Sequence, residues 1–152
     1  MERKLIGLFV NRKKDSKLEI TKKLIDMIVK YGMKPLIPES VSRDLGLNAG
    51  YTEAGMLKEA AFLISVGGDG TLLNMARTSF DYDIPVLGIN LGTVGFLADV
   101  EINEIENAVR RLADGDYRLK NRMVLSATVL RNSVSVFDSI AINDVVVNRD
   151  GL

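Results

Sequence analysis

The sequence predicts an α/β protein built on a mainly parallel sheet, followed by the first strands of an all-β part. Between residues 5 and 115, apolar runs of strand length alternate with helical patterns, and such uninterrupted runs are typical of buried parallel strands. Residues 118–149 instead are rich in Val, Leu, Ile and Thr without a helix signal, which indicates antiparallel strands. The change in pattern predicts a domain boundary near residue 117, with domains at 1–117 and 118–152.

The first strand and helix lie within residues 5–32. Leu5–Val10 is an apolar run of strand length. Ser16–Glu19 has the pattern of a capping box, which predicts that the helix starts there. Apolar residues then recur at helical spacing, and Gly32 is placed to end the helix. The segment is therefore predicted to be one strand–helix unit.

The remaining elements follow the same logic. Further parallel strands are predicted at residues 33–37, 62–66 and 84–89, the first of them at an edge because Pro35 cannot donate to a neighbour. Helices are predicted from Thr71 and from about Asn103 to Gly115, whereas residues 39–55 give only a loop and a short helix. At the end, 118–131 and 134–149 are predicted strands joined by a turn at Asn132-Ser133.

Composition excludes several classes of chemistry. The 152-residue chain has neither cysteine nor histidine, which rules out disulfides, thiolate zinc sites and histidine-based catalytic triads. Lys plus Arg and Asp plus Glu both total 20, so no net positive charge favours nucleic acid. A basic run at Arg12, Lys13, Lys14 and Lys17 fits a solvated helix face better than a polyanion site. Leu5–Val10 is too short for a membrane span or signal core, so we expect a cytoplasmic protein without membrane partners.

The most informative segment is the glycine loop, Gly67-Gly68-Asp69-Gly70-Thr71, which connects a predicted buried strand to a predicted helix. Glycines permit turns that other residues resist and let backbone N–H groups approach a ligand, while a helix N-terminus favours anions. A carboxylate beside phosphate implies either a bridging Mg²⁺ or a hydroxyl whose proton Asp69 accepts. The loop is therefore predicted to bind phosphate and to carry one reactive carboxylate.

Two familiar phosphate loops do not fit this segment. The Walker A pattern requires Gly-Lys-Ser/Thr, but Thr71 follows Gly70 directly. The dinucleotide fingerprint requires a third glycine where this chain has Leu73. A purely structural turn capped by Asp69 or Thr71 is the alternative, yet capping needs one residue and not three glycines. We therefore favour a functional loop.

Two further motifs occur later in the chain. Residues 88–97, the second glycine segment, follow the next predicted strand and include Asn90 and Phe96. Carboxyl ends of parallel strands share one edge of a sheet, so both glycine segments are predicted to face the same space. Asn143-Asp144 interrupts a predicted apolar strand, and either a polar ligand or simple turn polarity accounts for the pair equally well.

With these three motifs in order, the chain resembles the NAD kinase family, which phosphorylates the 2′-hydroxyl of the adenosine ribose of NAD. The glycine loop matches the family signature, the second glycine segment is similar to the family's own, and Asn143-Asp144 matches its asparagine-acidic pair. The resemblance implies a Rossmann-like, phosphofructokinase-like domain followed by the start of a β-rich NAD-binding domain. The glycine loop alone is shared with lipid and sugar kinases, which remain alternatives together with a non-catalytic nucleotide-binding module.

The resemblance also implies roles for individual residues. It makes Asp69 the base that accepts the 2′-hydroxyl proton and gives the phosphate loop as Gly67, Gly68, Gly70 and Thr71. Its implied NAD-binding residues are Asp69, Gly70, Leu73, Asn74, Phe96, Asn143 and Asp144, and no residue is assigned as a metal ligand. It further implies Mg²⁺ or another divalent cation, ATP or polyphosphate as donor, and a homodimer or homotetramer. The family continues beyond its asparagine-acidic pair, so we expect the 152-residue chain alone to make little or no NADP.

Overall fold

The computed structural model describes residues 3–92, 95, 97–98 and 100–148. The chain forms two compact units, Met1–Leu119 and Lys120–Leu152, and each is described here by itself. The roles predicted for 1–117 and 118–152 as two functional domains stay predictions. Within the described residues, no helix is long and apolar enough to cross a membrane.

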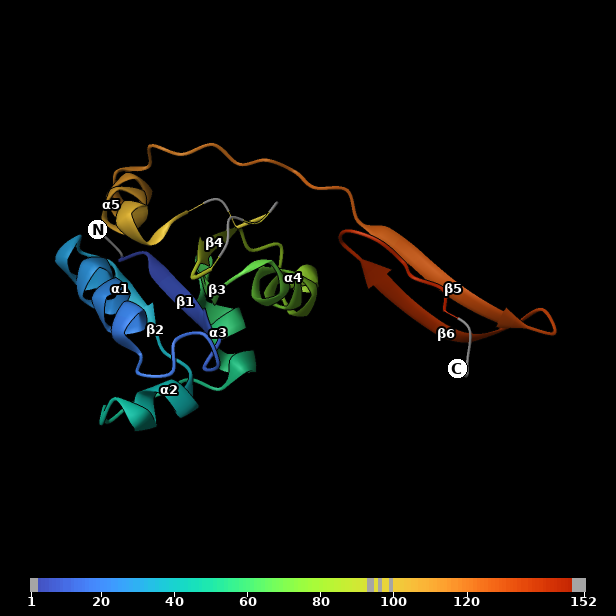
Figure 1. Cartoon of the computed structure of the whole chain (residues 1–152), viewed down its shortest axis with the longest axis horizontal. Coiled ribbons are helices and arrows are strands. Elements are labelled where there is room, and N and C mark those ends of the chain that lie inside the picture. The colour runs from blue at the N-terminus through green and yellow to red at the C-terminus, as the bar shows by residue number, and fades with distance from the viewer. Residues whose placement is uncertain (1–2, 93–94, 96, 99, 149–152) are drawn as a thin grey trace. The chain divides into compact units, whose positions relative to one another are not determined.

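A four-stranded parallel sheet forms the centre of the first unit (Figure 1), which confirms the predicted α/β class. Its strands are β1 (Leu5–Val10), β2 (Lys34–Leu36), β3 (Phe62–Gly67) and β4 (Val86–Asn90). The order in the sheet is β2-β1-β3-β4, and every pair is parallel. As Pro35 predicted, β2 lies at an edge.

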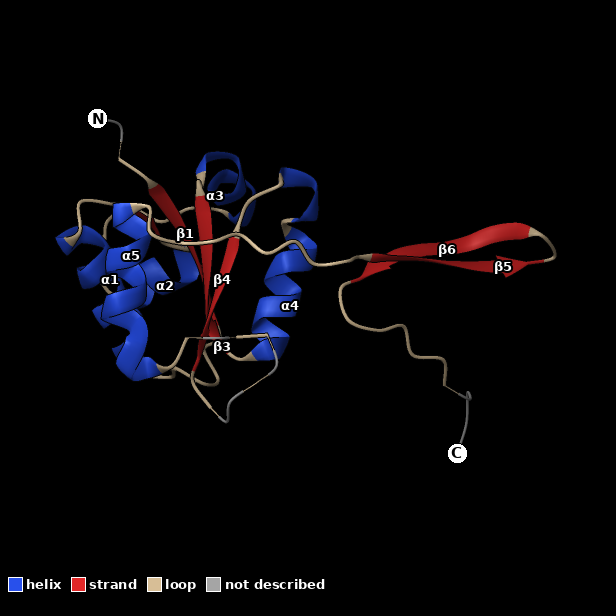
Figure 2. Ribbon diagram, turned by 90° about the horizontal axis from the view of Figure 1, so that it is seen from above, coloured by secondary structure: helices blue, strands red, loops and turns tan. Residues whose placement is uncertain are grey.

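Helices cover both faces of the sheet. The helices are α1 (Glu19–Lys30), α2 (Glu39–Asp44), α3 (Glu53–Glu59), α4 (Asp69–Thr78) and α5 (Ile105–Asp114), with short 3₁₀ turns η1 (Phe80–Tyr82) and η2 (Ile102–Glu104). One apolar core joins α1 and α5 to the sheet, and a second joins α3 and α4 to it. Figure 2 shows α1 and α5 on one side of the strands and α4 on the other. Alternate side chains of β1 and β3 supply the two cores because successive strand residues point to opposite faces.

The order of the strands creates a switch point between β1 and β3. From β1 the chain passes to β2 on one side, then returns to place β3 on the other side. The connections that leave β1 and β3 therefore diverge toward opposite faces at their carboxyl ends. In open parallel sheets, ligands bind outside the carboxyl ends of the strands at such a point.

The start of α1 differs from the capping box predicted at Ser16–Glu19. The helix begins at Glu19, and its N-cap residue Leu18 is buried in a left-handed conformation. The side chain of Asp15 caps the helix instead, because it accepts hydrogen bonds from the backbone N–H of Thr21 at 2.8 Å and from its hydroxyl at 2.6 Å. The N-cap thus lies two residues later than the predicted Ser16, with Leu18 buried in the core, and Asp15 takes over the capping role.

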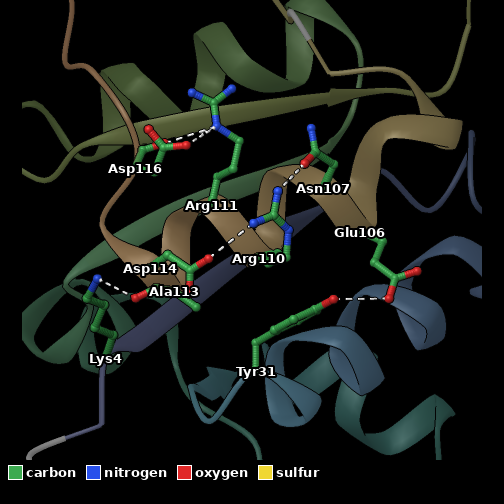
Figure 3. Close-up of polar contacts among 9 residues, drawn as sticks. All are labelled: Lys4, Tyr31, Glu106, Asn107, Arg110, Arg111, Ala113, Asp114 and Asp116. Atoms are coloured by element: carbon green, nitrogen blue, oxygen red, sulfur yellow. Dashed lines mark hydrogen bonds and ion pairs between the residues drawn. The ribbon is translucent and has the colours of Figure 1, made fainter.

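Polar contacts hold α5 at the edge of the first unit (Figure 3). The Lys4 ammonium donates to the carbonyl oxygens of Leu112 and Ala113 at the end of α5. The Glu106 carboxylate accepts from the Tyr31 hydroxyl at 3.1 Å, as Figure 3 shows. It also accepts from Lys30 Nζ at 2.5 Å, and the two contacts join α5 to α1. The hydrogen bond from Lys30 is the main reason that the pKa of Glu106 is lowered and that of Lys30 is raised.

The second unit is an antiparallel hairpin of β5 (Leu125–Arg131) and β6 (Val134–Ala141). Asn132 and Ser133 form its turn in left-handed conformations, which confirms the predicted hairpin turn. The strands are shorter than predicted, because residues 118–124 and 142–148 lie outside them. The prediction that Asn143-Asp144 sits within a strand is therefore wrong. Among the described residues of this unit the hairpin has only two strands, and apolar side chains such as Phe137 remain exposed.

Candidate active site

The glycine loop forms the junction of β3 and α4. The helix begins at Asp69, two residues before the predicted start at Thr71, and Gly68 is its N-cap. The Gly68 carbonyl oxygen accepts hydrogen bonds from the backbone N–H of Thr71 at 2.9 Å and of Leu72 at 3.1 Å. Asp69 and Gly70 therefore belong to the first helical turn, where a carboxylate is favoured by the positive end of the helix dipole.

The glycines serve the loop through close approach and not through a left-handed turn. The positive-φ glycines among the described residues are Gly32, Gly46 and Gly115. Because none of these belongs to the glycine loop, its turn does not need the left-handed backbone conformation that favours glycine. A Cβ at Gly67 would lie 2.3 Å from the Thr71 hydroxyl oxygen, whereas a Cβ at Gly70 would meet no atom of the described residues within 4 Å. Gly67 is therefore required by packing, and Gly70 leaves open space beside Asp69.

Asp69 connects the glycine loop to the second glycine segment. Its Oδ1 accepts hydrogen bonds from the backbone N–H groups of Leu97 at 3.2 Å and Ala98 at 3.0 Å. Gly95 lies so close that a Cβ there would be 2.2 Å from the same oxygen. The half-buried carboxylate is thus held in a fixed orientation by main-chain donors and by a residue without a side chain.

Asn90 fixes the start of the second glycine segment. Its buried side-chain oxygen accepts from the backbone N–H of Gly92 at 3.0 Å, and the backbone N–H of Leu91 donates to the Gly67 carbonyl oxygen at 2.7 Å. Together with the Asp69 contacts, these bonds bring both glycine segments to the same edge of the sheet. The parallel strand order produces this meeting, as the sequence predicted.

The end of β1 adds two residues that sequence reasoning did not place at the site. The Asn11 side-chain amide donates to the Thr71 hydroxyl at 3.1 Å. The Lys14 ammonium lies 2.6 Å from the position that a Cβ on Gly68 would take. It lies 3.5 Å from the position that a Cβ on Gly92 would take. The rule that strand ends share one edge could have found both residues had it been applied to the predicted strand at residues 5–10.

The other predicted site residues have different surroundings. Leu73 is half-buried and Asn74 exposed, both on α4 one turn beyond Asp69, while Phe96 lies outside the described residues. Asn143 and Asp144 are exposed in the second unit, where the Asn143 amide donates to the Asp144 carboxylate at 3.5 Å. The NAD contacts of all five residues, Leu73, Asn74, Phe96, Asn143 and Asp144, stay predictions.

The single carboxylate of the site, that of Asp69, suits a metal that arrives with phosphate. Within the described residues, no group of three acidic side chains could hold an ion by itself. Mg²⁺ in phosphate sites, however, is commonly bound by one or two carboxylates plus the phosphates of the substrate. Asp69 fits that arrangement as a single carboxylate at the head of α4.

Comparison with known proteins agrees with this geometry. The family model described as "ATP-NAD kinase N-terminal domain" matches residues 6–117. A protein named NAD kinase from Caldanaerobacter subterraneus is 34% identical over 147 residues, which are 96% of this chain and 52% of that protein. Its counterpart in Acetivibrio thermocellus is 36% identical over 148 residues, 97% of this chain and 51% of that protein. The chain thus spans about half the length of the curated relatives it matches.

A solved structure shows the same fold. It is a crystal structure of yeast NADH kinase complexed with NADH, with a TM-score of 0.79 and 18% sequence identity. The match covers 94% of this chain and 48% of the yeast chain. On the strength of the family model, the curated relatives and the motifs that meet at the sheet edge, this chain belongs to the NAD kinase family.

Proposed function

We propose that this chain supplies the phosphoryl-transfer half of an NAD kinase, which transfers the γ-phosphoryl group of ATP to the 2′-hydroxyl of the adenosine ribose of NAD. The observation that carries the proposal is the orientation of Asp69. Two backbone N–H groups hold its carboxylate at the head of α4, and the open space at Gly70 lies next to it. A reactant hydroxyl placed there would meet a positioned base beside a positive helix end.

The proposed reaction is a single in-line displacement. The 2′-oxygen of the ribose forms a bond to the γ-phosphorus, and the bond from that phosphorus to the β–γ bridging oxygen breaks, which releases ADP. The hydroxyl proton passes to the Asp69 carboxylate. Phosphoryl transfer depends chiefly on positioning and electrostatic stabilisation, so fixing Asp69 through Leu97 and Ala98 has a direct catalytic purpose.

The donor enters as its magnesium complex in this proposal. The description of the matching family model names ATP, which favours ATP over polyphosphate. When bound, Mg²⁺ would neutralise charge on the donor phosphates, while the Asp69 carboxylate keeps its role as the base. Binding of NAD by Asn143 and Asp144, and assembly into a homodimer or homotetramer, are further parts of the proposal that stay predictions.

The test compares Asp69→Asn with wild type in a full-length protein that carries this sequence. Turnover of NAD with ATP and Mg²⁺ is expected to fall by about 10²- to 10⁴-fold, the usual contribution of a general base. NAD affinity, measured by calorimetry, is expected to change little because the amide keeps the shape of the side chain. Asp81→Asn, which changes an exposed carboxylate on η1, is the matched control.

Two results would contradict the proposal. If Asp69→Asn keeps wild-type turnover, the carboxylate has only the structural role of joining the two glycine segments. If the wild-type protein phosphorylates a lipid or a sugar and not NAD, one of the alternative kinases is correct. Assaying the 152-residue chain in parallel tests the expectation that it makes little NADP alone.

A further inference from the structure

The β1–α1 connection places one lysine over the glycine loop. The basic residues Arg12, Lys13, Lys14 and Lys17 were expected on a helix face, but α1 begins only at Glu19, so all four lie in the connection. Among them, Lys14 has its ammonium 2.6 Å from the point that a Cβ on Gly68 would occupy. The ammonium is the far end of an exposed side chain, and the absence of a Cβ at Gly68 lets it lie over the glycine loop.

Asn11 holds the backbone of Lys14 in place. The Asn11 side-chain oxygen accepts hydrogen bonds from the backbone N–H of Lys13 at 3.0 Å and of Lys14 at 3.3 Å. The backbone carbonyl oxygen of Asn11 also accepts from the backbone N–H of Lys14 at 3.0 Å. The amide of the same side chain donates to the Thr71 hydroxyl in α4. Asn11 thus ties the connection to the glycine loop, and the Lys14 side chain starts from an anchored main chain.

The side chain of Lys14 is exposed, so its ammonium is accessible to a ligand from solvent. Arg12 pairs with Asp44, whereas no described carboxylate forms an ion pair with Lys14. Its ammonium also lies beside the N-terminus of α4, where the helix dipole disfavours a cation and favours an anion. An anion bound between the two would satisfy both.

The position of the Lys14 ammonium at the edge of the sheet favours a phosphate group as the anion. Lys14 follows β1 and Gly68 follows β3, so the ammonium lies at the switch point between these strands. Backbone donors at a helix N-terminus and a lysine ammonium are the groups that bind phosphate oxygens in nucleotide sites.

From this juxtaposition we infer that Lys14 binds the phosphate oxygens of the donor at the glycine loop. The inference rests on the proposed function and deepens it, since it names a residue that binds the donor and not NAD. The ammonium stabilises the negative charge on the phosphates as the bond to the departing ADP breaks, while Asp69 receives the proton. The two groups thereby serve the two different reactants.

The kinetic test uses Lys14→Gln in the full-length protein, with Lys13→Gln as a control that removes the same charge one residue away. The kcat/KM for ATP is expected to fall by about 10- to 100-fold in Lys14→Gln, the range for loss of a hydrogen bond to a charged group. Lys14→Arg is expected to recover part of the loss, and the affinity for NAD to stay unchanged. An equal effect of Lys13→Gln, or a loss confined to NAD affinity, would overturn the inference.

A binding test separates this inference from the proposed function. Inorganic tripolyphosphate with Mg²⁺ is titrated by calorimetry into wild type, Lys14→Gln and Lys13→Gln. Weaker binding in Lys14→Gln alone supports the inference even if the wild-type protein does not phosphorylate NAD. Equal binding by all three proteins, or no binding to wild type, overturns it even if NADP forms.

Discussion

Replacing Gly70 with alanine separates the structural from the functional reason for a glycine in this loop. Gly70 is the second residue of α4 and is absent from the positive-φ glycines, and a Cβ there would meet none of the atoms that the structure describes within 4 Å. For the fold, alanine is therefore the better residue. For a ligand that approaches Asp69 closely, the added methyl group is an obstacle.

The magnitude follows from these observations. A Gly→Ala change at a compatible helical position stabilises a protein by about 0.4–1 kcal/mol, chiefly because the unfolded chain loses freedom. In a domain near 120 residues, this corresponds to a rise in Tm of about 2–4 °C. Turnover of NAD in the full-length protein is expected to fall at least tenfold, because the methyl group occupies the space proposed for the reacting hydroxyl.

The assay measures thermal unfolding by circular dichroism together with NADP formation. Gly115→Ala is the matched control: its Cβ would also meet no described atom within 4 Å, but its φ of +76° strains any side chain. That variant is expected to lose about 1–2 kcal/mol of stability and to keep its kinetic constants. If Gly70→Ala destabilises the fold, the structural reasoning is refuted. If it is stable and fully active, the proposed ligand position is refuted.

Two further predictions concern the fold. Asp15→Ala is expected to lower the free energy of unfolding by about 2–4 kcal/mol, because α1 loses its cap and the fully buried Thr21 hydroxyl loses its acceptor. Denaturant titration measures this loss of stability. Adding Thr21→Val to the Asp15→Ala variant is expected to restore part of it. Glu106→Gln is expected to lower Tm at neutral pH and low salt. Folding lowers the pKa of Glu106 and raises that of Lys30, so the ion pair stabilises the fold between their ordinary pKa values of 4.5 and 10.5. The difference in Tm between wild type and Glu106→Gln is therefore expected within this pH range, and it is expected to disappear as the pH falls below 4.5. A difference that persists in acid or in high salt would contradict the ion-pair explanation.

Local sequence patterns predicted those parts of the fold whose cause is local. The apolar runs at Leu5–Val10 and Phe62–Gly67 are buried parallel strands, and Gly32 and Gly115 end their helices with positive φ. The turn at Asn132-Ser133 also formed as predicted. Burial in a two-sided sheet and left-handed turns are each encoded within a few residues, so the sequence alone suffices for them.

The errors arose where distant residues compete. Asp15 replaced the predicted capping box of α1 because Leu18 is buried in the core, against residues far from it in sequence. Residues 142–148 lie outside any strand, since a strand needs a partner that local pattern cannot supply.

The sequence by itself determined the class of the fold, the family and the identity of the central carboxylate, because the motifs that carry them are contiguous. Only the tertiary structure decided how that carboxylate is held and what surrounds it. Leu97 and Ala98 donate to Asp69 across 28 and 29 residues, and Lys14 reaches Gly68 from the neighbouring strand. These contacts depend on the order β2-β1-β3-β4, which brings the ends of separate strands to one edge and which no short segment of sequence contains.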